Sequence, residues 1–277
     1  MKSWSGMPIL VGTSGWQYKD WSGILYPRDI PHRLWLETYA AAFATVEVNA
    51  AFYRLPERET FTGWRARTPG DFTMAVKASR YLTHIRRLRD PEGPVRRLMA
   101  AASGLGPRLG PVLLQLPPTL VAEPSDLDAC LRCFPTGQRV AVEPRHESWW
   151  VPEVREVLER NGAALCWVDR GSRPVSPLWQ TADWGYVRLH GGSGAGHHYG
   201  RSALHHWVER IQGGWTPGAA VHVYFNNDAG GAAVDDAFAF ARMARHAGLE
   251  VSRTSRTPEP AEPSEPSEPP EHAGPSR

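Results

Sequence analysis

Pairs of polar residues, two positions apart, close four of the short apolar runs in this chain. The pairs are Glu47 with Asn49, Glu143 with Arg145, Arg188 with His190, and Tyr224 with Asn226. Because side chains alternate along a β-strand, both members of a pair face the same side of a sheet. Three further runs end in the same way, at Lys77, Gln115 and Asp169. We expect these side chains to gather in one cavity.

Three carboxylates of this set are the candidate catalytic groups. Glu47 and Glu143 are expected on different sides of the cavity, where a separation of ~6.5–9.5 Å would suit a general acid and a general base with a water between them. Nearby cations would keep one carboxylate ionised, while a drier environment would raise the pKa of the other. Asp169 is expected to orient the substrate or to stabilise positive charge.

The remaining members of the set indicate an anionic small molecule, phosphorylated or sugar-like, as the substrate. The positively charged residues predicted to bind it are Lys77, Arg145, Arg188 and His190. The neutral residues predicted to bind it are Trp16, Asn49, Gln115, Tyr224 and Asn226. Arginine suits a phosphate or carboxylate group because it offers two parallel hydrogen bonds. Glycines in segment 190–200 would leave backbone N–H groups free to approach an anion.

A metal-dependent isomerase or phosphodiesterase is the first alternative. Glu143, Asp169 and His190 end three consecutive strands, and oxygen and nitrogen ligands of this kind suit a divalent metal. Arg145 and Arg188 would oppose a cation at the same place. We therefore predict no cofactor and keep a divalent metal as the alternative.

A protein that binds without catalysis is the second alternative. Such a protein would bind a small molecule or a nucleic acid. Alternatively, the charges form only an internal ion-pair network that fills the top of the interior. The nucleic-acid candidate is the basic segment 84–89 (HIRRLR). Without residues 258–277 the chain carries 30 Lys and Arg against 24 Asp and Glu, a modest excess that disfavours nucleic acid.

Eight apolar runs of strand length alternate with segments long enough for a helix. The expected strands are 9–14, 45–51, 72–79, 111–117, 140–145, 164–169, 185–190 and 221–226. This alternation predicts an α/β fold, a single (β/α)8 TIM-type barrel over residues 8–253. In such a barrel the C-terminal ends of the strands form the rim where active sites lie.

The end of the chain has a different composition. Residues 254–277 are rich in Pro and Glu and lack large apolar side chains beyond position 257, so we predict a disordered acidic tail. No apolar run approaches the ~20 residues of a membrane span, and the start does not suit a secretory signal. We expect a cytoplasmic protein without a membrane partner, while the oligomeric state is not indicated.

The three cysteines do not predict a disulfide framework. Cys130 and Cys133 fit one helix without a second pair, which favours a structural role over redox chemistry or zinc. Cys166 has the opposite parity to Asp169 in its strand, so we expect it to face the helices.

The chain contains, in this order, the motifs GTSGWQYKDW, LYP, TVEVNAAFYRLP, KASRYLTH, LLQLPP, VEPRHESW, YVRLHG and VYFNN. Together they cover residues 11–227 and resemble the YecE-like family, domain of unknown function 72. The segment 143–147 matches the Glu-x-Arg-His pattern, whereas the loop after His190 is less typical. The resemblance implies a TIM-type barrel, and it implies equally an activity that has not been established.

Overall fold

The computed structural model describes residues 9–216 and 218–255, so the predicted acidic tail beyond Ser255 lies outside the described residues. The strands are β1 (Ile9–Thr13), β2 (Thr45–Val48), β3 (Thr73–Lys77), β4 (Leu109–Gln115), β5 (Val140–Glu143), β6 (Ala164–Leu165), β7 (Trp167–Arg170), β8 (Arg173–Pro174), β9 (Gly185–Leu189) and β10 (Val221–Phe225). The α-helices are α1 (Trp35–Ala42), α2 (Ala50–Tyr53), α3 (Arg58–Ala66), α4 (Glu92–Ala102), α5 (Pro124–Arg132), α6 (Pro152–Arg160), α7 (Arg201–Gly214) and α8 (Ala232–His246).

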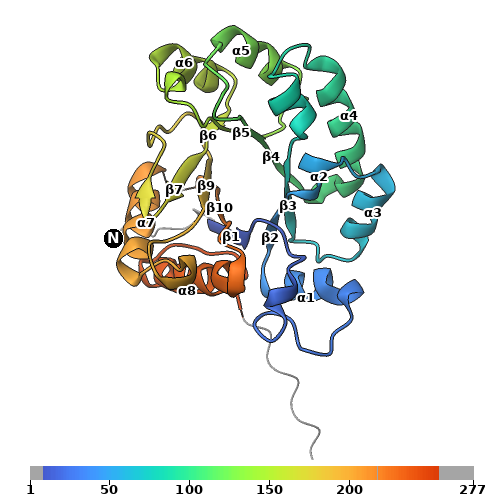
Figure 1. The fold of residues 1–277 in the computed structure, drawn as a ribbon, viewed down its shortest axis with the longest axis vertical. Helices are drawn as coiled ribbons and strands as arrows, with labels where there is room; N and C mark the ends of the chain where they lie inside the picture. The colour runs from blue at the N-terminus through green and yellow to red at the C-terminus, as the bar shows by residue number, and fades with distance from the viewer. Residues whose placement is uncertain (1–8, 217, 256–277) are drawn as a thin grey trace, which may run out of the picture.

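The strands form two five-stranded sheets, in the orders β1-β10-β9-β7-β8 and β2-β3-β4-β5-β6. Neighbouring strands are parallel, except that β8 runs antiparallel to β7. A bridge between Ser14 and Glu47 links the end of β1 to β2. The strands surround a common interior and the helices lie outside them (Figure 1). The chain therefore has the α/β fold with parallel strands that the sequence predicts.

Glycine allows two strands from different sheets to approach closely. A Cβ at Gly12 in β1 would lie 2.3 Å from the carbonyl oxygen of Thr45 in β2, a distance that no larger residue tolerates. The side chain of Thr45 in turn contacts the hydroxyl of Tyr224 in β10. The ends of three strands are therefore held together at this point.

The eight expected strands are all found, with bounds that differ by a few residues, and two of them differ in a way that affects the site. The expected strand 45–51 stops at Val48, because Asn49 adopts helical dihedral angles and α2 follows at once. The expected strand 164–169 is divided at Cys166, with β6 pairing with β5 and β7 pairing with β9. The hydroxyls of Thr181 and Ser176 accept hydrogen bonds from N–H groups at this break.

Alternation along the strands separates two layers of core. In β10, Val221, Val223 and Phe225 pack against the helices, whereas Tyr224 points into the interior. The interior also holds Cys166, so its expected position against the helices is wrong. Within the described residues, no helix is long and apolar enough to cross a membrane.

Candidate functional site

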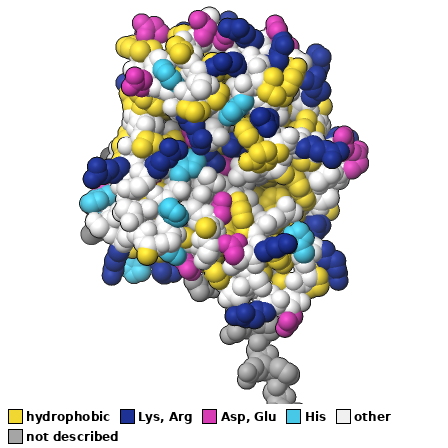
Figure 2. Space-filling model, viewed as in Figure 1, with side chains coloured by type: hydrophobic (Ala, Val, Ile, Leu, Met, Phe, Trp, Pro, Cys, Tyr) yellow, Lys and Arg dark blue, Asp and Glu magenta, His cyan; other side chains and the backbone are white. Residues whose placement is uncertain are grey.

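A cavity of about 510 Å³ lies at the C-terminal ends of the strands, a volume that suits a small molecule. Its lining residues are Tyr18, Asn49, Phe52, Tyr53, Lys77, Arg80, His84, Gln115, Arg145, Arg188, Asn226 and Asp228. Six of the residues predicted to bind substrate are thus brought together, namely Asn49, Lys77, Gln115, Arg145, Arg188 and Asn226. On the face seen in Figure 2, Lys, Arg and His side chains gather near the centre, over the strands.

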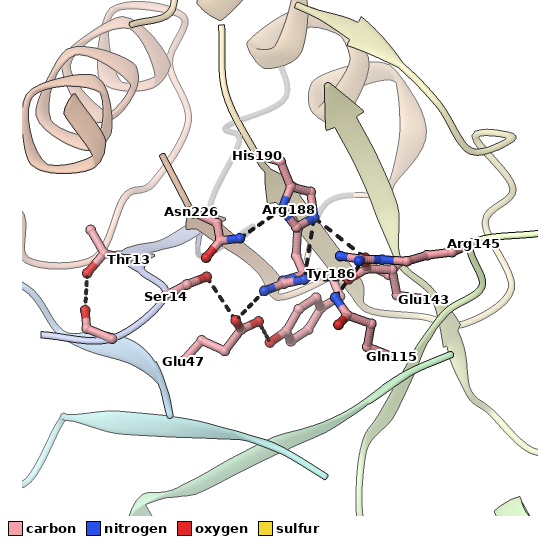
Figure 3. Close-up of polar contacts among 12 residues, drawn as sticks. Thr13, Ser14, Glu47, Gln115, Glu143, Arg145, Tyr186, Arg188, His190 and Asn226 are labelled. Atoms are coloured by element: carbon pink, nitrogen blue, oxygen red, sulfur yellow. Dashed lines mark hydrogen bonds and ion pairs between the residues drawn. The ribbon is translucent and has the colours of Figure 1, made fainter. Parts of the chain in front are cut away.

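Below the cavity, a buried guanidinium joins two buried carboxylates. Arg188 Nη2 lies 2.8 Å from Glu47 Oε1, and Arg188 Nη1 lies 2.5 Å from Glu143 Oε2. The three side chains are at most 1% exposed. Figure 3 shows Arg188 reaching from β9 between the two glutamates, which come from β2 and β5. We call Glu47, Arg188 and Glu143 the floor network.

Further hydrogen bonds occupy the remaining carboxylate oxygens of the floor network. Glu47 accepts hydrogen bonds from the hydroxyls of Ser14 at 2.8 Å and Tyr186 at 2.6 Å. Glu143 accepts hydrogen bonds from Gln115 and Arg145, each at 3.0 Å. Both buried carboxylates are therefore paired and hydrogen-bonded, as buried charges must be.

The electrostatics of the floor network keep both glutamates ionised. Burial alone would raise the pKa of Glu47, but the charge of Arg188 and the Tyr186 hydrogen bond lower it below its ordinary value. Burial would also raise the pKa of Glu143. Arg188, His190 and Arg145 lower this pKa, and they hold it well below its ordinary value. The guanidinium of Arg188 contacts both carboxylates at the place where a water between them was expected.

His190 is connected to the floor network and is neutral near pH 7. Its pKa is lowered by burial, and Arg188 adds to this, although the hydrogen bond to Glu143 opposes it. Its Nδ1 lies 2.8 Å from Asn226 Nδ2 and its Nε2 lies 3.5 Å from Glu143 Oε1. Arg188 Nη1, which is an N–H donor, also lies 3.4 Å from Nε2, so the imidazole links Asn226 to both Arg188 and Glu143.

Lys77 and Arg80 bring positive charge to one side of the cavity from the end of β3. Among the residues that the structure describes, neither side chain has a hydrogen bond or an ion pair. Lys77 Nζ instead lies 4.1 Å from the centre of the Phe52 ring. Burial and the charge of Arg188 lower the pKa of Lys77 to about 8, against the opposing effect of Glu47 and Glu143.

Asp228, which the sequence analysis did not select, also lines the cavity. Burial raises the pKa of its carboxyl to about 7; a hydrogen bond from Tyr18 opposes this, and the charge of Glu47 adds to it. A group that titrates near neutral pH can take up and release a proton during catalysis. The sequence signal was its position, two residues beyond Asn226 in the loop after the last strand. We call Lys77, Arg80 and Asp228 the wall groups.

Some polar atoms around the cavity have no partner in the described structure. They are Asn49 Oδ1, Arg188 Nε and Asp228 Oδ1. Polar groups that are removed from bulk water normally have a hydrogen-bond partner, so such atoms call for water or a ligand. These atoms therefore mark the side of the cavity where a bound molecule would gain hydrogen bonds.

The expected orientation of Asp169 is wrong. Its neighbour Val168 points into the interior, so Asp169 points outward, where it accepts hydrogen bonds from Tyr199 and Trp207, each at 2.7 Å. Burial raises the pKa of Asp169, although both hydrogen bonds oppose this. Asp169 therefore connects β7 to α7 and does not share the cavity with Glu143.

Three predicted substrate-binding residues are not part of the cavity lining: His190, which contacts the floor network, and Tyr224 and Trp16. Tyr224 points inward, but below the floor network, where its hydroxyl lies 2.7 Å from Thr45 Oγ1. Trp16 is 5% exposed and packs edge-on against Trp64 at 5.3 Å between ring centres. Both are packing residues in this structure, a role that their residue types allow equally well.

Three glycine N–H groups of segment 190–200 are engaged within the loop, contrary to expectation. The N–H groups of Gly192 and Gly194 donate to carbonyl groups of the same loop, at His197 and His198. The N–H of Gly191 donates to the hydroxyl of Tyr199 at 3.1 Å. The loop uses these donors to hold its own fold, so they are not available to an anion.

The metal alternative loses the ligand set on which it was based, because Asp169 points away from Glu143 and His190. Within residues 9–216 and 218–255, no group of three His, Cys, Asp or Glu side chains is placed to hold a metal ion.

The arginines of the basic segment 84–89 are mostly engaged with neighbouring residues. Arg86 pairs with Asp90, Arg87 donates to the carbonyl of Thr119, and Arg89 lies 3.8 Å from Asp126. His84 faces the cavity, and burial and Lys77 lower its pKa. The segment thus supplies one wall of a small cavity, and the structure adds nothing in favour of a nucleic-acid groove.

A family model described as "Protein of unknown function DUF72" matches residues 10–263. The chain belongs to this family. It is 31% identical over 173 residues to the UPF0759 protein YecE of Escherichia coli K12, an alignment that spans 60% of each chain. It is 24% identical over 261 residues to the UPF0759 protein YunF of Bacillus subtilis, covering 82% of this chain and 92% of YunF.

Solved structures of DUF72 proteins have the same fold. A family member from Thermotoga maritima MSB8 matches with a TM-score of 0.76 and 27% identity, over 86% of this chain and 99% of the other. A member from Enterococcus faecalis V583 matches with a TM-score of 0.73 and 20% identity, over 86% of this chain and 95% of the other. The names of these proteins state no substrate or reaction, so the function must be argued from the cavity.

Proposed function

We propose that this DUF72 protein is an enzyme that acts on an anionic small molecule in the cavity by acid–base chemistry. The observation that carries the proposal is that Lys77 and Arg80 lie in the cavity and, among the described residues, form no direct ion pair with a carboxylate. The floor network already pairs Arg188 with two glutamates, and Arg145 supplies the second positive charge that these carboxylates need. An anion would therefore find positive charge that the protein itself has left unpaired.

Binding and chemistry are assigned to different groups of the cavity. Lys77 and Arg80 attract the anion, and Arg145, whose Nε is held by Glu143, turns the rest of its guanidinium to the same space. Asp228 acts as the general acid or base, because its pKa of about 7 lets both protonation states exist at neutral pH. Glu47 and Glu143 position Arg188 and are not the proton-transfer groups.

We also infer that the two sheets close into one (β/α)8 barrel. The bridge from Ser14 to Glu47 supports the junction of β1 with β2. Cys166 alone separates β6, which pairs with β5, from β7, which pairs with β9. A closed barrel would place the cavity at the rim that serves as the active site in this architecture.

Sulfate is a suitable probe of the anion site because it keeps its double charge between pH 6 and pH 9. We expect sulfate to raise the thermal unfolding midpoint more than chloride does at equal ionic strength; about 1 kcal/mol of binding would raise it by about 2–4 °C. Arg80→Ala should lose this gain. Arg96→Ala, which removes an exposed arginine of α4, is the matched control and should keep it.

Catalysis is tested by incubating the protein with phosphorylated sugars and oxo acids and following their consumption by NMR. We expect Asp228→Asn to abolish the consumption while sulfate still stabilises the variant. Sulfate binding without consumption of any compound would favour the alternative of a non-catalytic binding protein. The absence of sulfate binding would contradict the proposal as a whole.

A further inference from the structure

Lysine is a rare residue in this chain, and one lysine lies in the cavity. Of the 31 Lys and Arg residues, only Lys2, Lys19 and Lys77 are lysines. Lys19 is exposed, whereas Lys77 at the end of β3 is 8% exposed. A guanidinium keeps its proton under all ordinary conditions, but a lysine amine can lose its proton and become a nucleophile. The cavity thus contains a cation that is capable of covalent chemistry.

The surroundings of Lys77 favour the neutral amine. The ring of Phe52 from α2 covers one side of Nζ, and no hydrogen bond or ion pair holds the amine among the described residues. The charged and titratable groups that face it are Glu47 of β2, Glu143 and Arg145 of β5, Arg188 of β9 and His84. A lysine that is desolvated beside other cations is the usual form of a nucleophilic lysine.

We propose that Lys77 forms an imine with the carbonyl group of an anionic aldehyde or ketone bound in the cavity. This inference rests on the proposed function, since Arg80 and Arg145 would hold the anionic end of the same molecule. It narrows the substrate class from anions in general to anions that carry a carbonyl group.

The reaction needs no oxidant or reductant. The lone pair of the neutral Lys77 amine forms a bond to the carbonyl carbon, and the oxygen takes up a proton as the nitrogen releases one. The hydroxyl of this carbinolamine then leaves with a proton as water, and the nitrogen lone pair forms the C=N bond. Asp228 lines the same cavity and, with its pKa of about 7, is suited to donate the proton that leaves with the water.

The probe is pyridoxal 5′-phosphate, an aldehyde that carries a phosphate group, followed by borohydride, which reduces an imine to a stable secondary amine. The full-length protein is labelled at pH 8, where the Lys77 amine is about half neutral, and the label is located by peptide mass spectrometry. We expect about tenfold more label on Lys77 than on Lys19, because only Lys77 is desolvated beside cations. Pyridoxal without the phosphate should label Lys77 much less, and sulfate should compete with the label.

Two variants control the assignment. Lys77→Arg should remove the label from this peptide, and Lys77→Met serves the same purpose if the arginine variant does not fold. Lys19→Arg should leave the labelling of Lys77 unchanged. Labelling of Lys77 in the parent protein that does not exceed that of Lys19 overturns the proposal, whatever the variants do.

Sulfate stabilisation of the same samples distinguishes a failure of the imine proposal from a failure of the proposed anion-binding function. Stabilisation by sulfate without preferential labelling of Lys77 would leave the anion site intact and refute the imine. The absence of both would refute the imine together with the proposed function. Preferential labelling that sulfate prevents supports both.

Discussion

The floor network and the wall groups are both rich in charge, yet they differ in how that charge is satisfied. Glu47, Arg188 and Glu143 form two direct ion pairs, and their carboxylate oxygens accept hydrogen bonds from four further side chains. Lys77 and Arg80 have no such partners among the described residues. The carboxylate oxygens of the floor network are therefore satisfied within the protein, although Arg188 Nε lacks a partner in the described structure. Lys77 and Arg80, by contrast, would gain from a bound anion.

This difference indicates that the two groups of charges have different roles, one structural and one in ligand binding. Satisfied buried charges hold geometry, because each is expensive to leave unpaired. Unsatisfied charges at the cavity surface cost stability and are useful only when a ligand arrives, which is the usual basis for placing function there. The sequence alone presents both kinds as polar residues at strand ends.

The largest effect is expected from breaking the floor network. Glu143→Gln would leave Arg188 and Arg145 without their shared carboxylate, and removal of one partner from a buried pair costs about 3–5 kcal/mol. The free energy of unfolding, measured in urea at pH 7, should fall by that amount. Glu147→Gln, which changes an exposed glutamate nearby, should change it by less than ~0.5 kcal/mol. Equal effects of the two variants would show that the floor network is not structural.

Lys77→Met is expected to have the opposite sign. The pKa of Lys77 is lowered to about 8 from an ordinary 10.5, so at pH 7 the folded protein carries a proton that it binds less tightly than the unfolded chain does. The variant should be more stable at pH 7 by about 1–2 kcal/mol. This advantage should shrink as the pH rises from 8 towards 10.5. A loss of stability at pH 7 would mean that Lys77 belongs with the floor network.

Asp228→Asn tests the acidic wall group through the pH dependence of the free energy of unfolding. The pKa of Asp228 is raised from 3.8 to about 7, so the parent should lose stability as the pH rises from about 4 to about 7 and then remain constant. Asp228→Asn has no carboxyl group at this position, so it should not lose stability in this way between about pH 4 and pH 7. It should therefore be more stable than the parent at pH 8. Urea denaturation of both proteins at pH 4, 6 and 8 provides the measurement, and parallel curves would contradict the raised pKa.

The smallest change in stability is expected from Arg80→Ala. Arg80 is exposed and has no hydrogen bond or ion pair among the described residues, so the unfolding free energy should change by less than ~0.5 kcal/mol. Its sulfate affinity should nevertheless fall. A variant that loses sulfate binding but not stability would separate the wall groups from the floor network most clearly.

Much of the site could be predicted from strand periodicity. Glu47, Lys77, Gln115, Glu143 and Arg188 all end parallel strands at positions that face the interior, and parallel strands present their C-terminal ends on one side. Alternation also relates Arg188 to His190 correctly. The local pattern was sufficient here because the opposite positions carry the apolar residues that pack against the helices.

Alternation failed for Asp169 and Cys166 because the sequence Cys-Trp-Val-Asp has apolar residues on both faces of the strand. Either face of this strand could point into the interior. If the strand faces the other way, every side chain moves from the interior to the helix side or the reverse. The outward orientation of Asp169 is accompanied by hydrogen bonds from Tyr199 and Trp207. These residues lie about 30 residues or more further along the chain, outside the interior.

The amino-acid sequence was enough to indicate the α/β fold and which strand ends carry charge, because both follow from short-range periodicity. The pairing of these charges was decided only by the tertiary structure. Arg188 meets glutamates that are 141 and 45 residues away, and Asp228 owes its pKa to burial and to Tyr18, Glu47 and Arg188 on other segments. Electrostatic interaction depends on distance in space and on exclusion of water, and neither quantity is contained in the order of residues along the chain.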